Sequence, residues 1–149
     1  MRETGVHKIE VHVSGICLQT LSSGDVQVLL GKRTNSRKLY PGLWDAGGGQ
    51  VYAQETFEQA CLRQIKEEFG LEAEIAATVG TYAIESEEAL IPGIVFLCRV
   101  QDNTSPKNDS GEFFEIGWFN LADLDSLDIL SGVKRDVLKA ALVYQLPVP

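Results

Sequence analysis

Hydrophobic and polar residues alternate along several short stretches of the chain, which is the pattern of half-buried β-strands. The first is residues 8–19, where Ile9, Val11 and Val13 are separated by polar neighbours. A turn containing serine and glycine leads to a second stretch at residues 26–33. Further extended stretches are predicted at residues 44–51, 72–84, 93–101 and 113–119. Loops are predicted at residues 34–43, in the segment SEEALIPG, and at residues 101–111.

Two other stretches carry the 3.6-residue period of an amphipathic helix. The first is residues 56–69, where Thr56 and Gln59 form a capping-box signature at the start. Gly70 stands where a helix usually ends in a left-handed residue. The second is residues 133–146, near the end of the chain. The hydrophobic residues of the first helix gather on one side, and they are Cys61, Leu62, Ile65 and Phe69.

The order of these elements predicts a fold class. Strands before and after one central helix, with a second helix last, predict an α/β fold in which a mixed sheet lies between helices. A length of 149 residues suits a single domain over residues 1–149, with a core of its own.

Composition narrows the classes of function. The net charge of −8 argues against a nucleic-acid-binding protein, which usually carries a basic field. No apolar run approaches a membrane span, and the first ten residues lack the apolar core of a signal peptide. Cys17, Cys61 and Cys98 are scattered, without metal or redox spacing. We therefore expect buried free thiols in a reduced, cytoplasmic setting.

The most specific pattern runs from Gly49 to Leu71, GQVYAQETFEQACLRQIKEEFGL. Gln64, Glu67 and Glu68 share one side of the predicted helix. Like charges at this spacing repel mildly, and Mg²⁺ prefers carboxylate oxygens, so this side is a candidate metal site. The segment resembles the box of the Nudix hydrolase superfamily, G-x5-E-x7-R-E-U-x-E-E-x-G-U, where U is aliphatic. The matching positions are Gly49, Glu55, Arg63, Ile65, Glu67, Glu68, Gly70 and Leu71.

The resemblance implies a Nudix α/β/α sandwich with a mixed β-sheet, in which the box forms a loop, a helix and a loop. It also implies a Mg²⁺ (or Mn²⁺) cofactor that assists hydrolysis of a pyrophosphate linkage. Glu68, Glu67 and the backbone carbonyl of Gly48 are the metal ligands carried over from the family. Arg63 is implied to organise the site by pairing with box carboxylates, and Glu55 is its candidate partner.

Gln64 is the one departure from the box, because the family has a glutamate after the arginine. A neutral amide binds Mg²⁺ weakly and cannot accept a proton. Three outcomes stay open: the base lies elsewhere, the enzyme is slow, or hydrolysis is lost and the domain is a sensor that binds a nucleotide or phosphorylated ligand. Glu112, which follows the polar loop at residues 101–111, is the first candidate for a base elsewhere, and Glu115 is the second.

The sequence gives weaker indications of which residues bind the substrate. The basic segment KRTNSRK at residues 32–38 lies near the glycine turn, and Arg33 is its best candidate for contacting phosphates because it ends a strand. We expect a small-molecule substrate in which a nucleoside diphosphate is linked to another group, such as a nucleoside triphosphate or a nucleotide sugar. The sequence does not determine the oligomeric state, so the protein could be a monomer or a homodimer.

Overall fold

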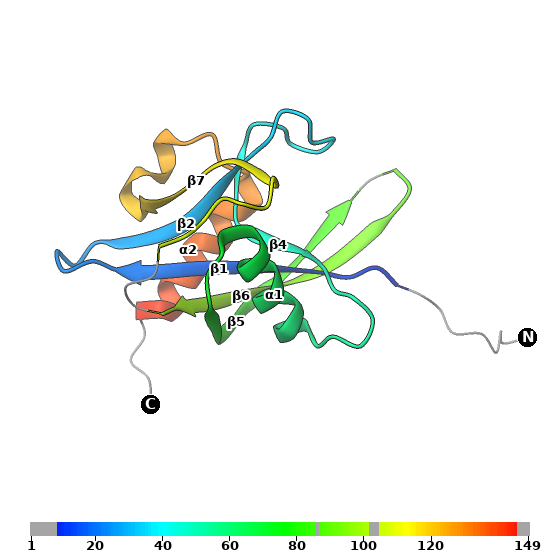
Figure 1. Cartoon of the computed structure of the whole chain (residues 1–149), viewed down its shortest axis with the longest axis horizontal. Coiled ribbons are helices and arrows are strands. Elements are labelled where there is room, and N and C mark those ends of the chain that lie inside the picture. Colours follow the sequence, from blue (N-terminus) through cyan, green and yellow to red (C-terminus); the bar gives the residue numbers. More distant parts are fainter. Residues whose placement is uncertain (1–8, 86, 102–104, 146–149) are drawn as a thin grey trace, which may run out of the picture.

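The computed structural model describes residues 9–85, 87–101 and 105–145, and its centre is a seven-stranded sheet (Figure 1). The strands are β1 (His12–Thr20), β2 (Val26–Arg33), β3 (Trp44–Asp45), β4 (Gly47–Gln50), β5 (Ala73–Glu85), β6 (Leu90–Val100) and β7 (Phe113–Asn120). Their order is β3-β2-β1-β6-β5, with β4 also paired to β1 and β7 to β2. The sheet is mixed, because β1 and β6 run parallel while the other pairs are antiparallel.

Helices cover both faces of this sheet. The helix α1 (Phe57–Phe69) lies on the near face in Figure 1, and α2 (Ser131–Gln145) lies behind the sheet. A short 3₁₀ helix, η1 (Leu121–Ser126), follows β7. Each face has its own hydrophobic cluster, one against α1 and one against α2. The predicted α/β/α sandwich with a mixed sheet is confirmed.

The central strands are buried on both faces, and alternation along β1 divides its side chains between the two clusters. Val13 and Cys17 point to the α1 side, whereas Ile16 and Leu18 point to the α2 side. All three cysteines of the chain are buried and free, as predicted. They belong to the cluster beneath α1.

The predicted α1 helix and its caps are confirmed. The N–H of Gln59 donates to Thr56 Oγ1 at 3.1 Å, and the N–H of Thr56 donates to Gln59 Oε1 at 2.9 Å. Both halves of the capping box are therefore formed. Gly70 ends the helix in the left-handed region, at φ 66°. The local signals alone were sufficient to locate this helix.

Several predicted boundaries were wrong. The first strand begins at His12 rather than residue 8, and Ile9 is 73% exposed. The strand β6 begins at Leu90, inside the predicted SEEALIPG loop. Its first residues pair only with β5, since pairing with β1 starts at Gly93. Proline and glycine suggested a loop here, but the hairpin extends beyond the rest of the sheet. The last helix begins at Ser131, two residues before the prediction, and η1 was not predicted.

Candidate active site

The glycine turn in β4 brings backbone against the start of β1 and the side of α1. A Cβ atom at Gly48 would lie 2.2 Å from the carbonyl oxygen of Val13, so a side chain does not fit. A Cβ at Gly49 would lie 2.4 Å from Gln64 Nε2. Gln64 thus packs directly over the turn. Glycine at these positions lets the helix approach the turn closely enough for its side chains to reach backbone groups.

Glu68 makes such a contact and is the buried carboxylate of the site. Its side chain turns inward from α1, only 4% of the residue is exposed, and Oε1 accepts a hydrogen bond from the Gly48 N–H at 2.9 Å. Burial raises the pKa of Glu68 to about 8, and the negative charges of Asp45 and Glu112 act in the same direction. The Gly48 hydrogen bond and the positive charge of Arg37 oppose this rise.

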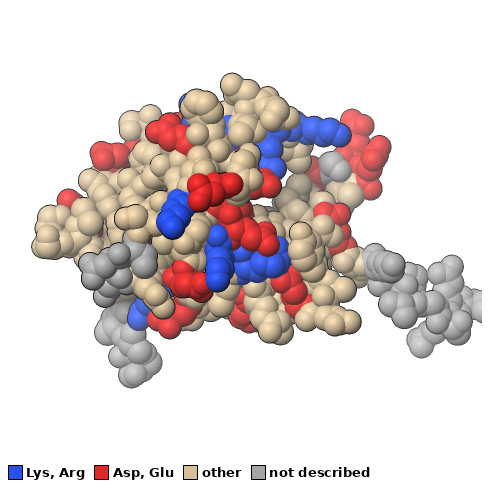
Figure 2. Space-filling model, viewed as in Figure 1, with Lys and Arg blue, Asp and Glu red and all other residues tan. Residues whose placement is uncertain are grey.

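Glu68 lies in a cleft of about 620 Å³, a volume typical of small-molecule sites. The cleft collects most of the predicted site residues from distant parts of the sequence. Those that line it are Arg33, Gly48, Gly49, Gln64, Glu67, Glu68 and Glu112. Figure 2 shows acidic and basic side chains gathered at the middle of this face, beside a hollow.

Arg63 and Glu55 do not line the cleft, and instead they join α1 to the loop before it. Arg63 Nε and Nη2 donate to the two carboxylate oxygens of Glu55 at 2.7 and 2.9 Å. Nη2 also donates to the Gln50 carbonyl at 2.9 Å, and the guanidinium lies 3.9 Å from the Tyr52 ring centroid. The hydrogen bond from Arg63 is the main cause that lowers the pKa of Glu55.

Glu67 differs from its neighbour Glu68 in orientation. Its side chain is 56% exposed and its Oε2 lies 3.3 Å from Arg63 Nη1. One carboxylate of the pair therefore lies in the interior of the cleft, and the other lies at its surface beside an arginine. The two share a side of α1, as the helical period predicted, but only Glu68 is enclosed.

Arg33 lines the cleft, but other parts of the protein occupy two of its nitrogens. Its Nη1 donates to Asp45 Oδ2 at 3.0 Å, and its Nε donates to the Leu39 carbonyl at 3.0 Å. Both side chains of the Arg33–Asp45 pair are largely buried. Burial raises the pKa of Asp45 despite the opposing charge of Arg33. Arg33 thus holds the loop of residues 34–43 against β3.

The sequence indicated Arg37 only as one of four basic residues that could contact phosphates, and it did not indicate Asp45, Tyr82 or Asp136 as side chains of the cleft. Arg37 lies 2.8 Å from Glu112, measured from Nη1 to Oε2, and Asp45 contributes a buried charge. Tyr82 of β5 and Asp136 of α2 also line the cleft. The basic segment KRTNSRK was the available signal for Arg37. Glu115, the second candidate for the base, is exposed on β7 and does not line the cleft.

The acidic side chains of the cleft are the groups that could hold a divalent cation. Among the described residues, no group of three or more His, Cys, Asp or Glu side chains is assembled to hold a metal ion. Mg²⁺, however, usually takes only one or two protein carboxylates and completes its shell with water and substrate phosphates. A buried carboxylate with one hydrogen bond, beside two further acidic groups, fits such a cation. The residues of the cleft are therefore compatible with Mg²⁺.

The protein is thus an α/β/α sandwich in which a charged cleft holds a buried carboxylate beside a glycine turn. The model of the NUDIX domain family matches residues 11–141, and the chain belongs to this family. Nucleoside triphosphatase NudI of Enterobacter sp. strain 638 is 32% identical over 126 residues, which cover 77% of this chain and 88% of that protein. ADP-ribose pyrophosphatase of Methanocaldococcus jannaschii is 27% identical, over 85% of this chain and 73% of that protein. The predicted class of enzyme, a Nudix pyrophosphohydrolase, is confirmed.

Solved structures support the same fold. The NUDIX domain of Shewanella oneidensis NrtR, complexed with ADP ribose, superposes with a TM-score of 0.78 at 17% identity, over 94% of this chain and 91% of that one. A C. elegans Ap4A hydrolase superposes with a TM-score of 0.75 at 17% identity, over 93% of this chain and all of that one (100%). None of the described helices is long and apolar enough to cross a membrane.

Proposed function

We propose that this protein hydrolyses, with Mg²⁺ or Mn²⁺, the pyrophosphate linkage of a nucleoside diphosphate joined to another group. A nucleoside triphosphate or a nucleotide sugar such as ADP-ribose is the substrate class that we favour. The single observation that carries the proposal is the buried carboxylate of Glu68, held against the glycine turn inside a charged cleft. The names of the relatives, a nucleoside triphosphatase and an ADP-ribose pyrophosphatase, support the substrate class.

Glu68, Glu67 and the Gly48 carbonyl are the groups that we assign to the metal. When bound, the cation neutralises the charge of the phosphates and polarises the attacked linkage. Glu68 must give up its proton before it can act as a ligand, and its raised pKa makes that step depend on pH. The Gly48 N–H holds the orientation of the carboxylate through one oxygen, which leaves the other oxygen available.

Glu112 is the residue that we assign to the attacking water. It reaches the cleft from the loop before β7, and its charge contributes to the raised pKa of Glu68, which indicates that the two carboxylates are close. In the proposed step, Glu112 accepts the proton of the water as the water attacks phosphorus. Gln64 cannot accept this proton, because its side chain is a neutral amide. A base outside α1 would let the enzyme hydrolyse its substrate although residue 64 is a glutamine.

Arg63 and Arg33 complete the assignment. The contacts of Arg63 with Glu55 and the Gln50 carbonyl fix α1 relative to the glycine turn, so we assign Arg63 to positioning the catalytic groups. Arg33 lines the cleft beside Asp45, and we retain it as a substrate-binding residue that also supports the loop of residues 34–43. The described fold is consistent with our proposal that residues 1–149 act as one domain.

A substrate panel tests the proposed function. Purified protein is incubated with Mg²⁺ and with nucleoside triphosphates, ADP-ribose or other nucleotide sugars, and the released phosphate products are quantified. We expect hydrolysis of at least one diphosphate-containing compound, and loss of it with EDTA. Binding of nucleotides without any hydrolysis would instead favour the alternative, a sensor domain in which Gln64 has removed catalysis.

A further inference from the structure

Arg37 is positioned in the cleft with hydrogen-bonding capacity that the protein does not use. Its Nη1 lies 2.8 Å from Glu112 Oε2. Its Nε is buried and has no hydrogen-bond partner among the described residues. A buried donor without an acceptor is costly, and such a group in a cleft indicates a missing partner. The acceptor that this cleft lacks is an anion.

The contrast with Arg33 supports this interpretation. Arg33 is bonded to Asp45 and to the Leu39 carbonyl, and both side chains of its ion pair are largely buried. The Arg37–Glu112 pair is more open, with side chains 35% and 45% exposed. An ion pair this exposed stabilises weakly, so it can be exchanged for another partner at little cost.

The backbone around Arg37 is held by contacts that do not involve the Arg37 side chain, including the hydrogen bond of its own N–H to the Thr34 carbonyl at 3.2 Å. Arg33 fixes the base of the loop, because its carbonyl accepts the Gly42 N–H at 3.0 Å while its side chain holds Leu39. Glu112 follows Gly111, which has a positive φ of 78° and open space around its Cβ position. The Arg37–Glu112 pair therefore joins the loop that follows β2 to the loop that precedes β7, which leave neighbouring strand ends where Arg33 pairs with Phe113.

We propose that Arg37 binds a phosphate of the substrate, and that it does so by exchanging Glu112 for that phosphate. Arginine matches phosphate oxygens through parallel N–H donors, which includes the Nε that now has no partner. The exchange also releases the Glu112 carboxylate, so this group becomes available to the attacking water only when substrate is present. The inference rests on the proposed function and adds the residue that recognises the phosphate.

Binding measurements can test the exchange separately from turnover. The probe is α,β-methylene-ADP, whose bridging carbon resists hydrolysis, titrated calorimetrically into the protein with saturating Mg²⁺. Arg37→Ala should weaken binding roughly 10- to 100-fold, as expected for losing a charged hydrogen-bonding partner. Glu112→Gln should tighten binding about two- to fivefold, because it removes the competing ion pair. The double variant should bind like Arg37→Ala, since Glu112 competes only through Arg37.

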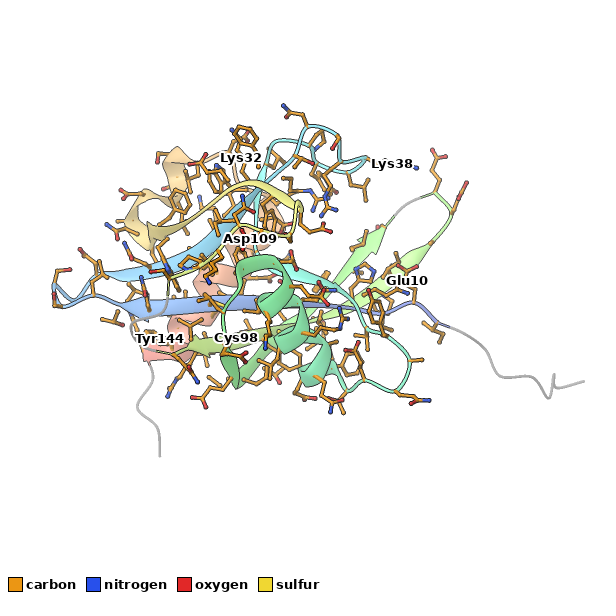
Figure 3. The ribbon with its side chains drawn as sticks, in the orientation of Figure 1. Glu10, Lys32, Lys38, Cys98, Asp109 and Tyr144 are labelled. Atoms are coloured by element: carbon orange, nitrogen blue, oxygen red, sulfur yellow. The ribbon has the colours of Figure 1, made fainter. Side chains whose placement is uncertain are left out.

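Lys38→Ala is the matched control. Lys38 is the next residue on the same loop, its side chain is exposed and points outward in Figure 3, and it does not line the cleft. Its loss removes the same charge and should leave the dissociation constant within twofold of the wild type.

Three results would overturn the exchange. They are weaker or unchanged binding in Glu112→Gln, unchanged binding in Arg37→Ala, and no measurable binding to the wild type at millimolar probe. If Arg37→Ala does not fold, Arg37→Lys and Glu112→Gln still provide the comparison. The substrate panel tests the proposed function independently of these binding measurements. The proposed function fails only if the wild type hydrolyses no member of the panel.

Discussion

The buried carboxyl of Glu68 makes the stability of the metal-free protein depend on pH. Its pKa in the folded protein is about 8, against an ordinary value of 4.5. Below pH 4.5 the carboxyl is protonated whether the chain is folded or unfolded. Folding then buries no charge at this residue and carries no free-energy cost for it. Between these two values the folded protein binds more protons than the unfolded chain, so stability falls as pH rises. Above pH 8 the full penalty is present.

The size of this penalty follows from the difference between the two pKa values. An upper bound is on the order of 5 kcal/mol, from 1.36 kcal/mol for each pKa unit. Part of this cost falls outside the interval from pH 5 to pH 8, and water that enters the cleft lowers it further, so we expect a loss on the order of 2–3 kcal/mol between these two pH values. This is a large part of the total stability of an ordinary domain, about 5–15 kcal/mol.

Glu68→Gln isolates the effect. The glutamine keeps an oxygen that accepts the Gly48 N–H, but it has no charge to bury. In EDTA, the variant should be more stable than the wild type at pH 8 and similar to it at pH 5. Urea unfolding, followed by the fluorescence of Trp44 and Trp118, measures this difference at each pH. Asp136 also has a raised pKa, but it is present in both proteins and cancels in the comparison. Asp45 interacts with Glu68 directly, so the measured difference includes the repulsion between these two carboxylates.

Glu67→Gln is the control for this experiment, because the Glu67 side chain is 56% exposed and its loss should not flatten the pH profile. Mg²⁺ adds a second test, since it should stabilise the wild type at pH 8 and have little effect on Glu68→Gln. Parallel pH profiles for wild type and Glu68→Gln in EDTA would refute the assignment of a costly buried charge to this residue.

Three further predictions concern catalysis and the organisation of the site. Gln64→Glu should raise turnover or tighten Mg²⁺ binding, measured by a metal titration of the rate, and looser Mg²⁺ binding would argue against a metal site here. Glu112→Gln should lower kcat about 10²- to 10⁴-fold, as expected for loss of a general base, whereas Glu115→Gln should be mild. If Glu115→Gln loses turnover instead, the roles are exchanged. Arg63→Lys should lower activity and stability together, because lysine cannot reproduce both bonds to Glu55, and unchanged melting and turnover would contradict the positioning role.

The parts of the site that depend on local sequence could be predicted, and α1 is the clearest case. Thr56, Gln59 and Gly70 specify its ends by contacts within a few residues. The helical period also placed Glu67 and Glu68 on one side. It could not show which of them is buried, because that depends on how closely the glycine turn of β4 approaches the helix.

Contacts between side chains that depend on strand pairing could not be predicted from the sequence. Asp45 meets Arg33 because β3 pairs with the end of β2, where Gly31 lies opposite Asp45. Arg37 meets Glu112 because β7 pairs with the same strand and brings its preceding loop over the cleft. Arg37 and Glu112 are far apart along the chain, whereas Arg33 and Asp45 are separated by one loop, and in both cases nothing in the local composition indicates the partner. The sequence consequently gave no sign of the hydrogen bonds that Arg33 makes to Asp45 and to the Leu39 carbonyl in the folded protein.

The central claim is that Glu68 holds the divalent cation on which hydrolysis depends. Its most direct test is the rate of hydrolysis of the best panel substrate as a function of Mg²⁺ concentration, for wild type and Glu68→Gln. The account predicts a saturable dependence on Mg²⁺ in the wild type. In the variant, it predicts that most of the activity is lost and that the remainder requires more Mg²⁺. Near-normal turnover of Glu68→Gln at limiting Mg²⁺ would contradict it.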